Sequence, residues 1–83
     1  MNVQIKYFAS IREALGQSGE VVATEAATLG ALRDGLIARG GAYAEALARG
    51  KAVRVALNHA LCDESAALCE GAEVAFFPPV TGG

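Results

Sequence analysis

The sequence predicts an α+β fold in which one main helix covers a mixed sheet of four to five strands. Short segments in which apolar and polar residues alternate, as in strands with one buried face, lie at both ends of the chain. Between them, one stretch carries apolar residues at helical spacing, namely Leu29, Leu32, Leu36 and Ile37. The 83 residues fit one core and leave little room for an enclosed active-site cavity, which disfavours a self-contained enzyme.

The first expected strand runs from Asn2 to Phe8, with Val3, Ile5 and Tyr7 on its apolar face. Phe8 itself falls on the other face, beside polar neighbours. A large aromatic residue at such a position is either covered by the next segment or serves as a contact residue. The sequence leaves both interpretations of Phe8 open.

Helix signals follow the first strand. Ser10 to Glu13 has the spacing of a capping box, which predicts a short helix that Gly16 ends. Residues 20–23 form the next expected strand, paired with the first. The main helix is expected to begin after Thr28 as its N-cap and to continue to Arg39, where a glycine pair follows.

The second half of the chain completes the sheet. Residues 43–49 suit another helical turn, and residues 53–57 alternate as a strand. A tight turn at Asn58 and His59 leads into a short edge strand over residues 60–62, and the last strand covers residues 73–77. This order suits a β-grasp (ubiquitin-like) roll, with the first and last strands adjacent and parallel at the centre of the sheet.

The chain ends with Pro78-Pro79-Val80-Thr81-Gly82-Gly83. The proline pair cannot donate ladder hydrogen bonds, so we expect a domain over residues 1–79 and an extended tail over residues 80–83. Four extended residues reach roughly 13 Å, far enough to enter a partner's pocket. Glycines without Cβ atoms leave the terminal carbonyl open to attack, although a Gly-Gly end can also simply fray.

Composition excludes several classes of function. The net charge is −2 and the basic residues are scattered, so nucleic acid is not an expected partner. No apolar run is long enough to span a membrane, and the N-terminus alternates immediately, unlike a signal peptide. We therefore expect a cytoplasmic protein that binds neither nucleic acid nor membrane.

The cysteines and the single histidine give no sign of a metal or catalytic site. Cys62 and Cys69 have too few potential co-ligands nearby, and we expect two semi-buried thiols without a metal. His59 lacks a nucleophile or carboxylate at a diagnostic spacing, so we interpret it as a solvated turn residue.

The segment Phe76-Phe77-Pro78-Pro79-Val80-Thr81-Gly82-Gly83 resembles the C-terminal signature of the molybdopterin synthase small (sulfur carrier) subunits, the MoaD family. Further similarity lies in Tyr7-Phe8-Ala9 with Arg12-Glu13, in Thr28 to Arg33 and in Leu68 to Val74, so the resemblance covers most of the chain. Ala72 departs from the family, which often has an acidic residue at that turn.

The resemblance implies a sulfur carrier that binds no separate cofactor. An ATP-dependent adenylyltransferase would activate Gly83 as a transient acyl-adenylate, and a sulfur donor would convert it to a thiocarboxylate, a C-terminal 1-thioglycine. The tail residues Val80, Thr81 and Gly82 would line the channel of the large synthase subunit. Two sulfur transfers there would turn cyclic pyranopterin monophosphate into molybdopterin, in a heterotetramer of two small and two large subunits.

The resemblance also implies an apolar partner surface at Phe8, Leu61 and Phe77, with Arg12 as a polar contact. Aromatic and leucine residues at strand spacing are equally often core residues. Three alternatives to a molybdopterin synthase carrier stay open: a thiamine-type sulfur carrier, a ubiquitin-like protein modifier, and a binding domain with an inert tail.

Overall fold

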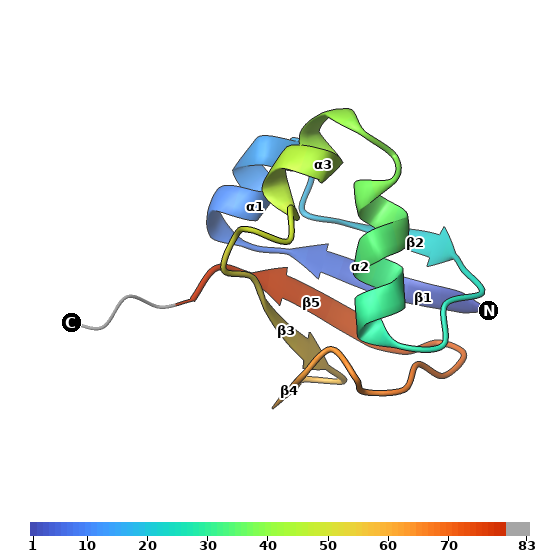
Figure 1. Ribbon diagram of the computed structural model, residues 1–83. Helices are drawn as coiled ribbons and strands as arrows, with labels where there is room; N and C mark the ends of the chain where they lie inside the picture. Colours follow the sequence, from blue (N-terminus) through green and yellow to red (C-terminus); the bar gives the residue numbers. More distant parts are fainter. Residues whose placement is uncertain (80–83) are drawn as a thin grey trace.

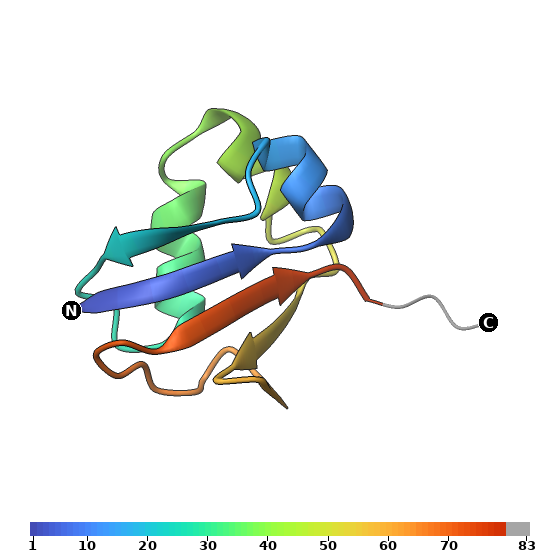
Figure 2. The same ribbon diagram turned by 180° about the vertical axis from the view of Figure 1, so that it is seen from behind.

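The computed structural model describes residues 1–79, which form one five-stranded mixed sheet and three helices (Figure 1). The elements in chain order are β1 (Asn2–Tyr7), α1 (Ala9–Leu15), β2 (Gly19–Ala23), α2 (Leu29–Ile37), α3 (Gly41–Ala46), β3 (Arg54–Leu57), β4 (Ala60–Cys62) and β5 (Glu73–Phe77). The strand order is β2-β1-β5-β3-β4, and only β1 and β5 pair in parallel. The predicted β-grasp arrangement is confirmed, including the first and last strands side by side (Figure 2).

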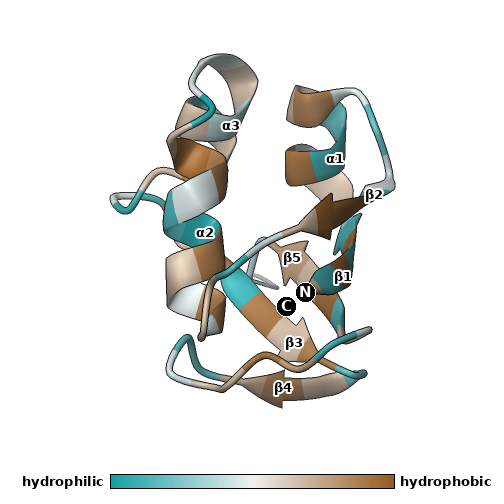
Figure 3. Ribbon diagram, turned by 90° about the vertical axis from the view of Figure 1, so that its right-hand side faces the viewer, coloured by the Kyte–Doolittle hydropathy of each residue, from teal (hydrophilic) through white to brown (hydrophobic). Residues whose placement is uncertain are grey.

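The three helices stand together on one side of the curved sheet (Figure 3). Alternation along β1 and β5 turns every second side chain toward them, and the strand residues Ile5, Val74 and Phe76 are at most 1% exposed. The predicted helical stripe supplies the other half of the core, since Leu29, Leu32 and Leu36 are buried. No helix of residues 1–79 lies on the opposite face of the sheet.

The start of α1 differs from the predicted capping box. The N-cap is Phe8, and no side chain caps this helix, so Ser10 lies within the first turn instead of before it. The Phe8 N–H donates to the Phe76 carbonyl at 3.2 Å, which keeps the chain in the sheet up to this residue. Ala9 then turns sharply, with a positive φ of 51°, and the helix begins at once. Gly16 ends α1 in the left-handed conformation, as predicted.

The N-cap of α2 is confirmed, because the Thr28 hydroxyl accepts a hydrogen bond from the Ala31 N–H at 3.2 Å. The helix ends at Ile37, two residues before the predicted end. The N–H groups of Arg39 and Gly40 donate to carbonyls three residues back, which tightens the last turn. As a result α3 begins at Gly41, earlier than predicted.

The predicted turn between β3 and β4 is also confirmed. Asn58 and His59 both have positive φ, 50° and 71°, as a type I′ hairpin turn requires. The Asn58 side chain accepts a hydrogen bond from the Glu73 N–H at 3.0 Å and so ties the turn to the start of β5. This contact fixes the hairpin against the central strand.

A buried arginine joins α2 to the segments around it. Arg33 is 4% exposed, and its guanidinium donates to the carbonyls of Leu47 and Ala48 and to the Glu64 carboxylate, each at 2.7–2.8 Å. Gly30 permits this arrangement, since a Cβ there would lie 3.3 Å from the Glu64 backbone oxygen. Because the charge is fully paired, its burial is compatible with a stable core.

Replacement of Arg33 by alanine is expected to lower the free energy of unfolding by about 1–3 kcal/mol, because it leaves the carbonyls of Leu47 and Ala48 without this donor and removes one of the two arginine partners of Glu64. Urea denaturation measures the loss. Arg54→Ala is the control: this side chain is exposed and forms no ion pair within residues 1–79, so its removal should cost less than about 0.5 kcal/mol. Equal losses in the two variants would contradict the assigned role of Arg33.

Glu20 on β2 holds a second network that links the sheet to α3. Its carboxylate accepts hydrogen bonds from the hydroxyls of Tyr7 at 2.9 Å and Tyr43 at 2.6 Å, and from Arg39 at 3.0 Å. Burial alone would raise the pKa of Glu20, but hydrogen bonds from Tyr43, Arg39 and Tyr7 outweigh it and lower that pKa. Burial, together with the hydrogen bond to Glu20, raises the pKa of Tyr7.

A lowered carboxyl pKa in the folded state stabilises the fold above the ordinary value of 4.5, and this stabilisation is lost as the pH falls through the folded value. Glu20→Gln should therefore cost about 1–3 kcal/mol at pH 7 and progressively less below about pH 4.5. Urea denaturation across this range measures the slope. Glu25→Gln, at an exposed position, should retain the wild-type slope, and a Glu20→Gln variant that also retained it would refute the assignment.

Candidate functional site

The sheet face without helices carries an apolar patch, which we call the open-face patch. It is formed by side chains from four neighbouring strands or strand ends: Phe8, Ala56, Leu61, Ala75 and Phe77. Strand register sets these residues side by side, because Ala56 pairs with both Ala75 and Leu61. Phe8 follows the Tyr7–Phe76 pair and so lies across from Phe77. The predicted contact residues Phe8, Leu61 and Phe77 therefore share one face.

The patch is accessible to a partner. Phe8 is 45% exposed and Leu61 is 75% exposed, whereas Phe77 is half-buried. No segment of residues 1–79 covers Phe8, so cover by the next segment is excluded, and its role as a contact residue stays a prediction. A shallow hollow of about 670 Å³ lies at the centre of the patch, and its lining residues are Phe8, Ala9, Ala56, His59, Ala75, Phe77, Pro78 and Pro79.

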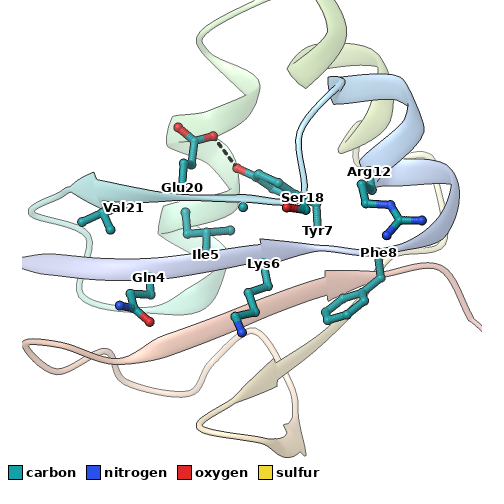
Figure 4. Close-up of a pocket in the computed structure, with 10 residues that line it drawn as sticks. Gln4, Ile5, Lys6, Tyr7, Phe8, Arg12, Ser18, Glu20 and Val21 are labelled. Atoms are coloured by element: carbon teal, nitrogen blue, oxygen red, sulfur yellow. Dashed lines mark hydrogen bonds between the residues drawn. The ribbon is translucent and has the colours of Figure 1, made fainter.

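Arg12 borders the patch from α1. Gln4, Lys6 and Phe8 project from β1 to the open side, and Arg12 lies beside the Phe8 end of this row (Figure 4). All four residues line a second hollow of about 400 Å³ over β1 and β2. Phe8 lines both hollows and so forms the ridge between them. The structure therefore places Arg12 beside Phe8, and that these residues contact a partner stays a prediction.

The residues that lead to the tail are firmly held. Phe76 is fully buried and stacks on Tyr7 with 6.3 Å between ring centroids. Pro78 and Pro79 follow β5 directly and line the hollow of the open-face patch. The predicted tail residues Val80, Thr81, Gly82 and Gly83 lie outside the described residues, so their roles and the domain boundary at residue 79 stay predictions. The structure gives the position of Pro79, from which the chain continues.

The single histidine and the two cysteines lie outside the open-face patch or at its edge. His59 is a turn residue as predicted, with its side chain 80% exposed and 3.2 Å from the Glu73 carboxylate. Cys62 is half-buried and burial raises the pKa of its thiol, which disfavours the nucleophilic thiolate. Cys69 is exposed, so the prediction of two semi-buried thiols was wrong for this residue. Within residues 1–79 there is no cluster of three or more metal-ligating side chains.

Four residues around the patch were not predicted as site residues: Lys6, Arg54, Ala56 and Ala75. Their signal was strand parity, because each lies an even number of residues from Phe8 or Phe77 or pairs with such a residue. Register between distant strands could not be read from parity alone.

Among the residues that the structure describes, none of the helices has the length and apolar character needed to span a membrane.

Residues 5–83 match the ThiS family. The molybdopterin synthase sulfur carrier subunit of Escherichia coli K12 is 41% identical over 81 residues, which cover 98% of this chain and 99% of that protein. Among solved structures, SAMP1 from Haloferax volcanii, a small archaeal modifier protein, is similar with a TM-score of 0.77 and 29% identity over the full length of both chains.

A third relative was solved together with a partner. The complex of subunits 1 and 2 of the molybdopterin-converting factor from Helicobacter pylori contains a chain with a TM-score of 0.69 and 27% identity to this one, over the full length of both. These similarities confirm the resemblance and the β-grasp fold that the sequence predicted. With a family match over residues 5–83 and a relative 41% identical along nearly its whole length, the chain belongs to the ThiS family.

Proposed function

We propose that this protein is the sulfur carrier subunit of a molybdopterin synthase, and that the carboxylate of Gly83, as the terminal residue, is its reactive group. The observation that carries the proposal is the 41% identity, over nearly full length, to a relative with that name. The structure adds support, because the residues that precede the tail emerge beside an exposed apolar patch suited to a partner.

The proposed chemistry needs an activated carboxylate. A Gly83 carboxylate oxygen would attack the α-phosphate of ATP, releasing pyrophosphate and forming an acyl-adenylate. A sulfur nucleophile at the oxidation level of sulfide would then attack the carbonyl carbon and expel AMP, leaving a thiocarboxylate. No redox change is needed in these steps. After sulfur passes to the pterin substrate, water restores the carboxylate.

In this proposal the protein presents the Gly83 carboxylate to its partners and supplies no catalytic side chain. Burial raises the pKa of the Cys62 thiol, and residues 1–79 contain no group of three or more metal-ligating side chains. Activation would belong to an ATP-dependent adenylyltransferase, and sulfur transfer to the large subunit. In this proposal the protein carries a covalent 1-thioglycine and no separate cofactor.

The large subunit is the proposed partner at the open-face patch. The Helicobacter pylori chain similar to this one was solved in a complex of subunits 1 and 2 of its converting factor. Phe8, Leu61 and Phe77 would supply the apolar contacts, and Arg12 would supply a polar one. Val80, Thr81 and Gly82 would line the partner's channel, in an assembly of two small and two large subunits.

Incubation with the activating enzyme, ATP and a sulfide source should raise the intact mass by about 16 Da, the exchange of one oxygen for sulfur. Intact-mass spectrometry measures this change. The variant that lacks Gly83 should fold normally, gain no sulfur and produce no molybdopterin. An unchanged wild-type mass, under conditions in which the activating enzyme modifies a known carrier, would refute the proposal.

A protein modifier is the second candidate function, favoured by the similarity to the small archaeal modifier protein of Haloferax volcanii. The same activated Gly83 would then be joined to lysine amines of other proteins. Such a modifier would appear in cell extracts as conjugates of higher mass that disappear in the variant without Gly83. A sulfur carrier for thiamine synthesis would instead show the mass gain without supporting molybdopterin production.

Leu61→Ser tests the proposed interface without disturbing the core, because this side chain is 75% exposed. The free energy of unfolding should change by less than about 0.5 kcal/mol, while the affinity for the large subunit falls about tenfold or more. Isothermal titration calorimetry measures the affinity. Val21→Ser is the matched control, since Val21 is 66% exposed on β2, outside the open-face patch, and should bind normally. Weaker binding by the control alone would place the interface elsewhere.

A further inference from the structure

Basic side chains divide into two groups in this structure. Of the seven Lys and Arg residues, Arg33, Arg39 and Arg49 form ion pairs with Glu64, Glu20 or Asp34. The other four form no ion pair within residues 1–79, namely Lys6, Arg12, Lys51 and Arg54. All four are exposed.

Three of these cations lie beside the open-face patch. Lys6 pairs in register with Ala75, and Arg54 pairs with Phe77, so the two charges lie on opposite sides of β5. Arg12 lines the hollow on the far side of Phe8, whereas Lys51 lies in a small hollow among α1 and α3 residues on the helical side. Lys6, Arg12 and Arg54 are scattered in the sequence but border one patch, and we call them the basic border.

Carboxylates of the described residues lie mostly elsewhere. Glu73 lies on the open face at the opposite end of β5, where it faces His59, and Glu70 accepts a hydrogen bond from the N–H of Asn2 at the start of β1. Glu20 is enclosed by the Tyr7 network. Two exposed acids lie near the patch: Glu13 on α1 next to Arg12, and Asp63 after Leu61, whose carboxylate accepts hydrogen bonds from Ser65. A chain with net charge −2 therefore presents a basic border beside its apolar patch.

We infer that the open-face patch docks on an acidic surface of the large synthase subunit, in which carboxylates surround an apolar anchor. This inference rests on the proposed function and deepens it. Side chains of the anchor would enter the hollow over Ala56 and Ala75, where small residues leave room between Phe8 and Phe77. The carboxylates would meet Lys6, Arg12 and Arg54 at the rim. Charge complementarity favours an acidic partner surface over a basic one.

The two parts of the surface should act on different kinetic steps. Exposed rim charges attract a partner over a distance of about one Debye length, roughly 10 Å at 0.1 M salt, so they raise the association rate. Apolar contacts that are desolvated in the complex mainly set the dissociation rate. The basic border would thus orient the molecule so that the chain beyond Pro79 meets the partner's channel first.

Stopped-flow association with the purified large subunit at low and high salt tests this inference. The double variant Lys6→Ala with Arg54→Ala should associate about tenfold more slowly at low salt, with a weaker salt dependence and little change in the dissociation rate. Both side chains are exposed, and thermal unfolding of the variant verifies that it folds. The rates of variant and wild type should converge at high salt.

A second double variant, Ala31→Glu with Ala42→Glu, changes the net charge by the same −2 at exposed positions on the helical side of the molecule. It should associate within about twofold of the wild-type rate if the basic border acts locally. Equal slowing of both variants, or an unchanged rate in the Lys6 and Arg54 variant, would overturn the inference while leaving the proposed function intact. Failure of the wild type to bind the large subunit at any salt concentration would refute both.

Discussion

Parallel pairing of β1 with β5 is the contact on which the rest of the structure depends. It joins the first strand to the last, and its inward side chains Ile5, Tyr7, Val74 and Phe76 are among the most deeply buried in the protein. The same pairing sets Phe8 beside Phe77, because each residue follows a paired, buried aromatic residue. Burial of apolar side chains on one face thus fixes the geometry of the opposite face.

The position of the helices leaves this opposite face accessible to a partner. All three helices lie on one side of the sheet, so the outward residues of β1, β3, β4 and β5 meet solvent. A sheet face with aromatic and small apolar side chains is costly to leave exposed unless a partner covers it. Proline residues at the end of β5 line this face, which links the partner surface to the segment proposed to carry sulfur.

The basic residues divide between internal ion pairs and the open face of the sheet. Arg33 and Arg49 hold the α2 region through Glu64, and Arg39 joins Glu20 to Tyr43, whose ring lies 4.9 Å from the guanidinium carbon. These arginines stabilise the helical side of the molecule. Lys6, Arg12 and Arg54 take no part in it, so they remain available to a partner at the open face.

Several predicted features followed from local chemistry and were confirmed. Alternation predicted the strands, the leucine stripe predicted α2, and Thr28, Gly16 and the turn at Asn58 were placed correctly. The capping box at Ser10 was wrong, because a tertiary hydrogen bond from Phe8 to Phe76 decides where α1 begins. The end of α2 was two residues too late because propensity alone does not locate the last turn.

By itself, the sequence determined the order of elements, which residues face the core, and the family resemblance carried by the Phe76 to Gly83 segment. Periodicity and turn chemistry act over a few residues, so these features needed no knowledge of distant contacts. Only the tertiary structure decided that no part of residues 1–79 covers Phe8, that Ala56 and Ala75 lie next to the aromatic residues, and that three cations without an ion pair in residues 1–79 lie beside them. Strand register and the choice of ion-pair partners join residues far apart in the chain, and no local pattern specifies them.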